Sequence, residues 1–264
     1  MFRFTVIHFL LNMQQKKIVF LASDCESSRW VFNALIKDFD IEMAIIEQPV
    51  SKKDLIKSRL KRIGFIKVAG QIFFSAFIVP FLKMTAKTRR ISLISQYQLV
   101  DTSFIKSKTQ RVASVNEEAC KILLQKINPD IVIVNGTRII SKRILQCCQA
   151  AFINMHVGIT PKYRGSHGGY WALYNNDPEN FGTTIHFVDS GIDTGAVIKQ
   201  VFIKPTKADN FVTYPILQVS IGIDALINVL QQALTGELKS ASHNEKGKMY
   251  YQPTAWEYFL NKSK

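Results

Sequence analysis

The sequence is short of cysteine, and the few cysteines that it has are not paired. Its four cysteines, Cys25, Cys120, Cys147 and Cys148, form no C-x-x-C motif. Adjacent cysteines such as Cys147 and Cys148 are poor disulfide partners, so the pattern is typical of a protein in a reducing cytoplasm. The spaced cysteine and histidine pairs that hold structural zinc are also missing, and we expect no metal site. The sequence contains no internal repeat and no low-complexity segment, which argues against a repeat architecture.

Acidic residues are also scarce. The chain has 34 Lys and Arg against 20 Asp and Glu, which gives a formal net charge of +14. A field of this sign attracts nucleic acid, membrane surfaces and anionic small molecules. The basic residues are densest over 52–67 and 83–90, but no zinc finger, arginine-rich block or aromatic RNA-binding strand accompanies them. We therefore expect an anionic small-molecule substrate and no nucleic-acid partner.

No uninterrupted apolar run reaches the ~20 residues that a bilayer requires. Residues 1–15 begin with an apolar stretch that imitates a secretion signal, but no small-x-small cleavage site follows it. We interpret these residues as an N-terminal extension, with Met13 as the natural start. The apolar stretch Val68–Leu82 is interrupted by Gln71 and Pro80. It predicts a buried or surface-docked helix rather than an integral membrane segment.

The order of apolar runs predicts an α/β fold with a doubly wound, Rossmann-like, mostly parallel sheet. Lys17–Ala22 and Ile41–Ile46 have the length of strands and flank a helical pattern over Arg29–Lys37. Ile131–Val134, with the sequence IVIV, is typical of a buried parallel strand. Residues 51–109 depart from this rhythm, and we expect them to form a helical insertion.

The remaining elements complete a catalytic domain over 16–204, followed by a C-terminal helix and tail over 205–264. The tail carries several aromatic residues, so we expect it to dock on the domain, where it also offers a homodimer contact. The patterns predict helices over Glu117–Ile127, Ser141–Cys148, Trp171–Tyr174 and Phe211–Leu234, and strands over Phe152–His156, Thr183–Val188 and Ala196–Ile203.

The motif N-x-H places two chemically useful side chains at the end of a strand. Asn154 and His156 are two residues apart, so their side chains point to the same face of the strand. The carboxyl ends of strands in open α/β sheets are where ligands bind. An amide N–H that stabilises an oxyanion and an imidazole that moves protons suit acyl transfer. Alone, such a short motif is more commonly a turn beside a buried structural histidine.

Two further motifs follow along the chain. Residues 161–165 read P-K-Y-R-G, a rigid and basic loop with no evident role in packing a core. Residues 182–195 read GTTIHFVDSGIDTG, in which a strand leads into a glycine-flanked loop that carries Asp189 and Asp193. A single aspartate in a D-x-G loop is normally a turn former that bonds to its own backbone.

Taken in order, N-x-H, P-x-Y-R-G, W-A-L and the D-x-G-x-D-T-G loop resemble the formyltransferase family that uses 10-formyl-tetrahydrofolate. The resemblance is strong over Asn128–Gln200 and extends to Lys16–Ile46 only in the order of elements. It implies an enzyme that moves a formyl group from this folate to an amine without a metal. It also implies that Asn154, His156 and Asp193 are the catalytic residues.

The same resemblance implies where the two substrates bind. The pterin of the folate is expected against two loops that contain Asn135, Gly136, Thr137, Arg138, Ile139, Asp189, Ser190 and Gly191. The amine is expected beside Lys162, Tyr163, Arg164, Gly165, His167 and Tyr170, although Arg164 would serve equally well to brace its loop. Trp171 is expected in the core, and His186 is expected to be structural.

The acceptor amine is the least determined part of the prediction. The first loop, Ser23–Ser28, has two acids and no glycine, unlike the glycine-rich loop that cradles phosphate in glycinamide ribonucleotide formyltransferases. About sixty residues follow Gln200, fewer than the β-barrel domain of initiator-tRNA formyltransferases needs. The chain most resembles the sugar-nucleotide N-formyltransferases of polysaccharide biosynthesis, and a nucleotide-linked amino sugar is the expected acceptor.

Other interpretations stay open. They are an acceptor that is glycinamide ribonucleotide or methionyl-tRNA, a non-catalytic folate- or nucleotide-binding relative, and a membrane-associated subunit anchored by Val68–Leu82.

Overall fold

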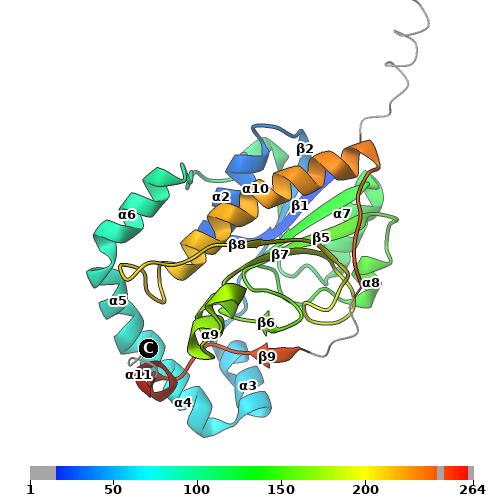
Figure 1. The fold of residues 1–264 in the computed structure, drawn as a ribbon. Coiled ribbons are helices and arrows are strands. Elements are labelled where there is room, and N and C mark those ends of the chain that lie inside the picture. Colours follow the sequence, from blue (N-terminus) through cyan, green and yellow to red (C-terminus); the bar gives the residue numbers. More distant parts are fainter. Residues whose placement is uncertain (1–15, 243–246, 261–264) are drawn as a thin grey trace, which may run out of the picture.

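The computed structural model describes residues 16–242 and 247–260, so the extension predicted over 1–15 lies outside the described residues. Its centre is a seven-stranded sheet with helices on both faces (Figure 1). The strand order is β3-β2-β1-β4-β5-β7-β8. The strands are β1 (Ile18–Ser23), β2 (Ile41–Glu47), β3 (Thr109–Val112), β4 (Ile131–Asn135), β5 (Ala151–His156), β7 (Gly182–Phe187) and β8 (Val197–Phe202).

The sheet is parallel from β3 to β5, which confirms the predicted doubly wound α/β fold. At the other edge β7 runs antiparallel to β5, and β8 runs antiparallel to β7. The pleat of β4 shows how the sequence builds both faces. Ile131 and Ile133 pack into one buried cluster, while Val132 and Val134 pack into the cluster on the opposite face.

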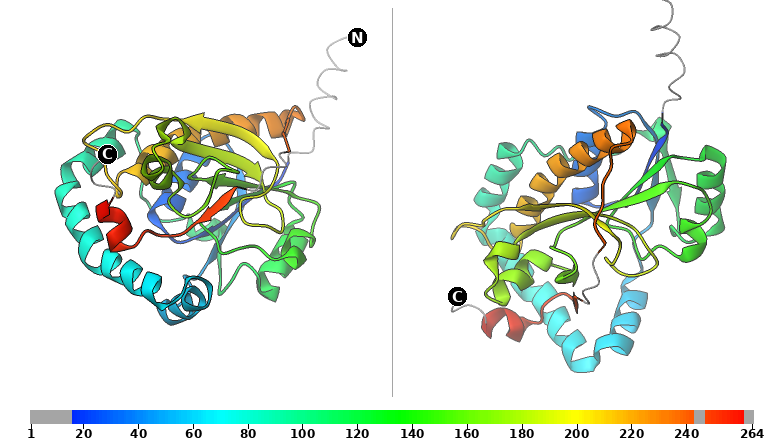
Figure 2. Two further views of the ribbon diagram at one scale, coloured as in Figure 1. Left: turned by 60° about the horizontal axis from the view of Figure 1, so that its bottom comes forward. Right: turned by 45° about the vertical axis from the view of Figure 1, so that its right-hand side comes forward.

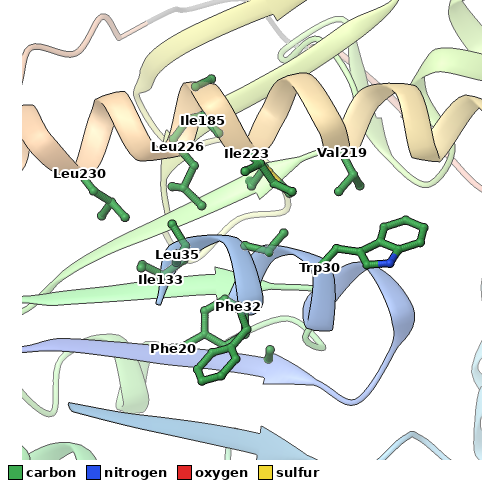
Figure 3. Packing of buried hydrophobic residues seen from close by; sticks show 14 of the residues in the cluster. Phe20, Trp30, Phe32, Leu35, Ile133, Ile185, Val219, Ile223, Leu226 and Leu230 are labelled. Atoms are coloured by element: carbon green, nitrogen blue, oxygen red, sulfur yellow. The ribbon is translucent and has the colours of Figure 1, made fainter. Parts of the chain in front are cut away.

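Helices α2 (Glu26–Leu35) and α10 (Tyr214–Thr235) cover the first of these faces. Figure 3 shows apolar side chains of both helices meeting side chains of the strands, among them Phe32 and Leu35 of α2 and Ile223 and Leu226 of α10. The opposite face is covered by α7 (Glu118–Ile127) and α8 (Lys142–Leu145). From the sequence we expect this helix beyond the catalytic domain, over 205–264. In the structure α10 packs in the central core.

A curved row of helices runs along one edge of the molecule (Figures 1 and 2). We call it the helical arc. It comprises α3 (Lys52–Ile63), α4 (Phe65–Phe73), the π-helical turn η1 (Phe74–Ile78), α5 (Val79–Thr85) and α6 (Lys87–Gln96). The helices predicted over the first part of the 51–109 region are therefore present. Its last part contributes the short 3₁₀ helix η2 (Lys106–Lys108) and the edge strand β3.

The inner side of the arc packs on a third buried cluster, which is rich in aromatic residues. This cluster includes residues of α9 (Gly168–Tyr174), which follows the short strand β6 (Tyr163–Gly165) and precedes the 3₁₀ helix η3 (Pro178–Asn180). The tail docks here, as predicted, through β9 (Lys248–Tyr250), which pairs with β6, and α11 (Ala255–Leu260). Trp171 is in this core, also as predicted. A homodimer contact through the tail stays a prediction.

Candidate active site

A cavity of about 530 Å³ opens where the carboxyl ends of β4 and β5 meet the loop that follows β7. Open α/β sheets bind their ligands at such strand ends. The two loops predicted to hold the folate form much of its wall, and of their eight predicted residues all except Ser190 line it. The three predicted catalytic residues Asn154, His156 and Asp193 line it as well.

Strand β5 delivers the first two of these side chains. Asn154 and His156 lie on the same face of the strand, and the register with β7 places Asn154 directly opposite His186. The His156 side chain is almost fully buried, with 6% of its surface exposed. Its Nε2 donates to the carbonyl oxygen of Tyr163 at 3.0 Å. Gly158 makes this approach possible, because a Cβ there would lie 2.7 Å from Nε2 and 2.6 Å from that carbonyl oxygen.

The loop after β7 carries the carboxylate of Asp193 to the same place. Its Oδ2 lies 3.5 Å from Nδ1 of His156 and accepts a 2.9 Å hydrogen bond from the backbone N–H of Gly165. Asp193 has a φ of 51°, in the left-handed region that aspartate tolerates better than most residues. An imidazole and a carboxylate that are 37 residues apart in the sequence therefore form one pair.

Burial and this pairing shift the pKa of each of the two groups in opposite directions. Burial lowers the pKa of His156, while the Asp193 carboxylate and the Tyr163 carbonyl partly oppose it. For Asp193, burial raises the pKa, but the His156 ring and the Gly165 N–H outweigh it, and the pKa falls to about 2. At pH 7 the site therefore holds an ionised carboxylate beside a neutral imidazole that is available as a proton acceptor.

His186 is a further member of this site, although from the sequence we expect it only to be structural. Its Nδ1 lies 2.7 Å from the carbonyl oxygen of Phe187, which can only accept, so Nδ1 carries the proton. The other nitrogen, Nε2, then accepts from Nδ2 of Asn154 at 3.1 Å and lies 3.7 Å from Oδ1 of Asp193. His186 thus holds the amide in one orientation. The sequence does show that His186 lies on the strand that leads into the Asp193 loop. Only the register of β5 with β7 shows that it lies opposite Asn154.

The turn after β4 is built for close packing rather than for charge. Gly136 has a φ of +64°, and a Cβ there would lie 3.2 Å from Oγ of Ser23. Arg138 lines the cavity, but its guanidinium is 2.6 Å from the buried carboxylate of Glu47 and donates to the carbonyl oxygen of Gln48 at 2.8 Å. Its positive charge is therefore already neutralised by the protein.

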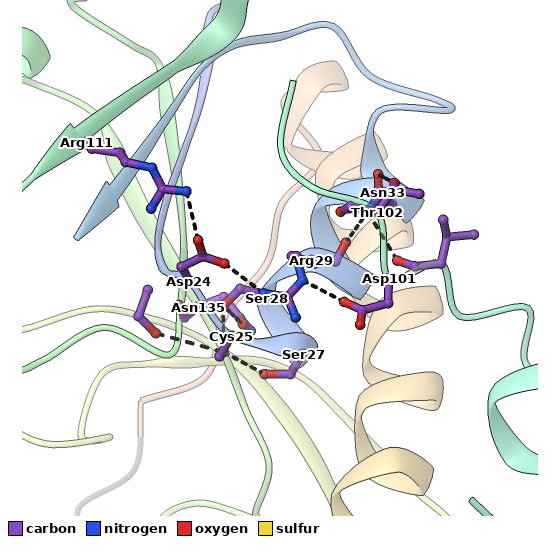
Figure 4. Close-up of polar contacts among 12 residues, drawn as sticks. Asp24, Cys25, Ser27, Ser28, Arg29, Asn33, Asp101, Thr102, Arg111 and Asn135 are labelled. Carbon is purple, nitrogen blue, oxygen red and sulfur yellow. Dashed lines mark hydrogen bonds and ion pairs between the residues drawn. The ribbon is translucent and has the colours of Figure 1, made fainter. Parts of the chain in front are cut away.

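The first loop is held by its own ion pairs (Figure 4). Asp24 accepts from Arg29 at 2.7 Å and from Arg111 at 2.8 Å. The hydrogen bond from Arg111 is the main cause that lowers the pKa of Asp24. Ser28 joins the loop to the turn after β4 through Oδ1 of Asn135, at 3.0 Å. The carboxylate of Asp24 thus pairs with the two arginines next to this loop, Arg29 of α2 and Arg111 of β3, which disfavours a phosphate there.

The residues predicted to bind the amine are only partly brought to the cavity. Gly165 and His167 line it. Lys162 and Tyr163 instead line a second cavity, where Nζ of Lys162 is 2.5 Å and the hydroxyl of Tyr163 is 2.6 Å from the carboxylate of Asp177.

Arg164 and Tyr170 also have structural contacts. Arg164 donates to the carbonyl oxygens of Ile192 at 3.5 Å and Gly247 at 2.5 Å, so it braces its loop. Tyr170 is buried in the aromatic cluster. The side chains of Lys162, Tyr163, Arg164 and Tyr170 thus satisfy the protein's own polar groups or pack in its core. Arg164 takes the bracing role that the sequence left open, and a contact of these residues with the amine stays a prediction.

Over residues 16–242 and 247–260, no group of three or more His, Cys, Asp or Glu side chains is arranged to hold a metal ion.

Comparison with known sequences points to one family. The sequence model of the formyl transferase family matches residues 76–214, just over half of the chain. The methionyl-tRNA formyltransferase of Finegoldia magna is 42% identical over 86 residues, which are 32% of this chain and 27% of that protein. That of Gloeothece citriformis is 33% identical over 124 residues, 47% of this chain and 37% of that protein. The chain thus spans only 27% and 37% of the length of these two curated relatives.

Solved structures share the fold. A sugar N-formyltransferase from Shewanella sp. superimposes with a TM-score of 0.54 at 17% identity, over 89% of this chain and 76% of that one. The phosphoribosylglycinamide formyltransferase of Anaplasma phagocytophilum gives a TM-score of 0.57 at 14% identity, over 90% of this chain and all of that one. These low identities establish a common architecture and leave the acceptor open.

Proposed function

The chain belongs to the formyl transferase family, and on this premise we propose that it transfers the formyl group of 10-formyl-tetrahydrofolate to an amine. The observation that carries the proposal is the convergence of an amide, an imidazole and a carboxylate on one cavity. Asn154 and His156 come from β5, and Asp193 comes from the loop after β7. The folate would lie against the turn after β4 and the 189–191 loop.

The geometry suits attack of a neutral amine on the formyl carbon. A carbon–nitrogen bond forms, and the formyl oxygen becomes an oxyanion. The Nδ2 of Asn154 has two N–H groups, of which one is directed to His186 and the other is available to that oxyanion. As the tetrahedral intermediate collapses, the bond to N10 of the folate breaks and the carbonyl re-forms.

The amine must also lose a proton, and N10 must gain one. His156 is suited to take up this proton at Nδ1, where the carboxylate of Asp193 at 3.5 Å stabilises the imidazolium that results. Returning the proton to N10 completes the transfer and restores the neutral ring. Direct transfer and transfer through a water molecule both satisfy this balance.

We infer that the acceptor is a nucleotide-linked amino sugar. The first loop supports this choice, because Asp24 and its arginine partners occupy the position at which a glycine-rich loop would cradle a ribose phosphate. The formal net charge of +14 supports an anionic acceptor. All four cysteines lie in the described residues and are free thiols, which supports a cytoplasmic location.

Methionyl-tRNA is the second candidate acceptor, because the 42% identity over 86 residues is to an enzyme named for it. A panel of acceptors separates the two. Purified protein is incubated with 10-formyl-tetrahydrofolate and, in turn, nucleotide-linked amino sugars, glycinamide ribonucleotide and charged initiator tRNA. Mass spectrometry of the acceptor then detects the addition of one formyl group.

We expect a formylated product from an amino sugar, formed about 100- to 1000-fold more slowly when Asn154→Ala replaces the native protein. Formylation of tRNA alone would overturn the choice of acceptor and leave formyl transfer intact. No tetrahydrofolate release with any acceptor, together with no binding of folate, would contradict the enzymatic proposal itself.

A further inference from the structure

The outer side of the helical arc exposes a continuous apolar surface, which we call the ridge. Phe73, Phe77 and Phe81 are four residues apart and therefore lie on one side of the helix, with the rings of Phe73 and Phe77 4.8 Å apart. More than half of each of these three side chains is exposed. The ridge consists of these residues with Phe65, Ile66, Ile72 and Met84. A surface of this kind marks a contact site.

The inner side of the same helix fixes the ridge in an outward position. Phe74 is fully buried, and its ring packs edge-on against that of Phe211 at 4.9 Å. Gly70 lies so close to the ring of Trp256 that a Cβ would come within 2.1 Å of it. Nε2 of Gln71 donates to the carbonyl oxygen of Gln252 at 2.6 Å. The helix cannot turn to bury its outer residues without breaking these contacts.

The charge of the arc indicates what the ridge would contact. Residues 51–100 hold eleven Lys and Arg and one acid, so this segment carries +10 of the chain's formal charge of +14. Lys67 and Lys83 are exposed at the two ends of the ridge, and no charged residue lies between them in the sequence. An apolar centre with basic flanks is complementary to a surface that is apolar inside and anionic at its rim.

We propose that the ridge docks the protein on the surface of a membrane that contains anionic lipid. The segment Phe65–Thr85 is long and apolar enough to cross a membrane by length and composition, with a mean hydropathy of 1.8, and so is Tyr214–Thr235. The latter is two-thirds buried in the core, and a third of the former is buried against the protein. A helix with one side committed to the protein lies in the membrane interface and does not span it.

Docking would place the membrane close to the reaction cavity. The ring of Phe74, on the inner side of the helix, packs against that of Phe211, whose centre lies 4.6 Å from that of the tilted His167 ring. His167 lines the cavity. The ridge and one wall of the cavity therefore belong to one packed unit. This inference does not depend on the proposed acceptor.

The test is co-sedimentation of the purified full-length protein with two kinds of vesicle, one of phosphatidylcholine alone and one that also contains phosphatidylglycerol. We expect binding to the anionic vesicles and little to the neutral ones. The triple variant Phe73→Gln, Phe77→Gln, Phe81→Gln and the double variant Lys67→Glu, Lys83→Glu should each weaken binding by about tenfold or more. Formyl transfer to a soluble acceptor without vesicles should be unchanged in both.

Matched control variants make the result specific. Ile122→Gln with Phe202→Gln removes two apolar side chains that are 55% exposed elsewhere, and Lys126→Glu reverses an exposed charge on α7. None of these should alter binding. Equal loss in the controls, absence of vesicle binding, or a dimer in light scattering that only the Phe variant dissociates would overturn the proposal. Binding of tRNA that needs the lysines but not the phenylalanines, without vesicle binding, would also overturn it.

Discussion

The β5–β7 strand pair and the helical arc both depart from the usual pattern of buried apolar and exposed polar side chains, in opposite directions. In the β5–β7 strand pair, polar side chains are buried: His156 is 6% exposed and His186 is 2% exposed. On the arc, large apolar side chains face solvent, and Phe77 is 64% exposed. Burying polar groups costs free energy unless they are paired, and exposed apolar patches favour association. The first region is therefore suited to chemistry and the second to contact.

The two regions also differ in what holds their unusually placed side chains in position. The polar side chains of the β5–β7 strand pair and of the loop after it have partners, as Asn154 has in His186 and as Asp193 has in His156 and Gly165. The apolar residues of the ridge have a rigid support behind them, and their outer surface faces away from the protein. Polar groups that are already hydrogen-bonded to one another can bind a small molecule without rearranging. The apolar side chains of the ridge can be buried only against a surface outside the protein.

The sharpest contrast lies between two adjacent phenylalanines of the arc. Phe74→Ala removes a fully buried ring and should lower the free energy of unfolding by about 3–5 kcal/mol. Phe73→Ala removes a ring that is half exposed and should change it by only about 0.5 kcal/mol. Urea unfolding followed by tryptophan fluorescence measures both values. Similar values for the two variants would mean that the arc does not have an inner and an outer side.

In the β5–β7 strand pair, the largest effect of a substitution should be on the rate of formyl transfer. Asn154→Ala removes the amide donor to the oxyanion, and kcat should fall by about 100- to 1000-fold. Asn228→Ala is the matched control, because among the residues that the structure describes its amide bonds only to the carbonyl oxygen of Asp224 within its own helix. Release of tetrahydrofolate, followed by absorbance, gives both rates. An active Asn154→Ala variant would remove the amide from the mechanism.

His186→Gln tests the residue that positions the amide. Glutamine can still accept a hydrogen bond, but it does not hold Asn154 at the same distance, so kcat should fall by about ten- to a hundredfold. The KM for the folate should change little, because His186 acts through Asn154. A change in KM alone would show that His186 contacts the folate instead.

The smallest effect is a dependence of stability on pH that the two buried imidazoles impose. Burial is the main cause that lowers the pKa of His156 and lowers that of His167 to about 4. Between pH 6.5 and pH 4 the unfolded chain therefore binds more protons than the folded one, and stability falls as the pH falls. Each ring contributes a slope of at most about 1.4 kcal/mol per pH unit.

His167→Gln should remove one part of that slope, because glutamine does not titrate. Urea unfolding at several pH values in this range measures it. An unchanged slope in the variant would show that His167 is already accessible to protons in the folded protein.

The parallel half of the sheet could be predicted from sequence because its signal is local. Runs such as Ile131–Val134 are apolar over the length of a strand and are buried on both faces, so composition alone identifies them. The edge strand β3 could not be predicted, since it has four residues with mostly exposed side chains. The direction of β7 and the pairing of β6 with β9 depend on long-range contacts that no local pattern records.

The residues of the candidate site also differ in whether the sequence alone could predict their positions. Asn154 and His156 share a strand, and the i, i+2 rule places them together. Asp193 was assigned through a family resemblance, and the structure places it beside His156. Tyr163 and Tyr170 are expected beside the amine because a tyrosine hydroxyl has the chemistry of a ligand. The sequence does not show that their rings turn into the core.

The central claim is that the carboxylate of Asp193 assists His156 in moving the proton of the reacting amine. The most direct measurement compares the native protein with Asp193→Asn, which keeps the size of the side chain and removes its charge. Tetrahydrofolate release gives the rate, and fluorescence titration gives the affinity for folate. We predict a loss of kcat of about 100-fold or more with folate binding retained. An unchanged kcat in Asp193→Asn would contradict this account.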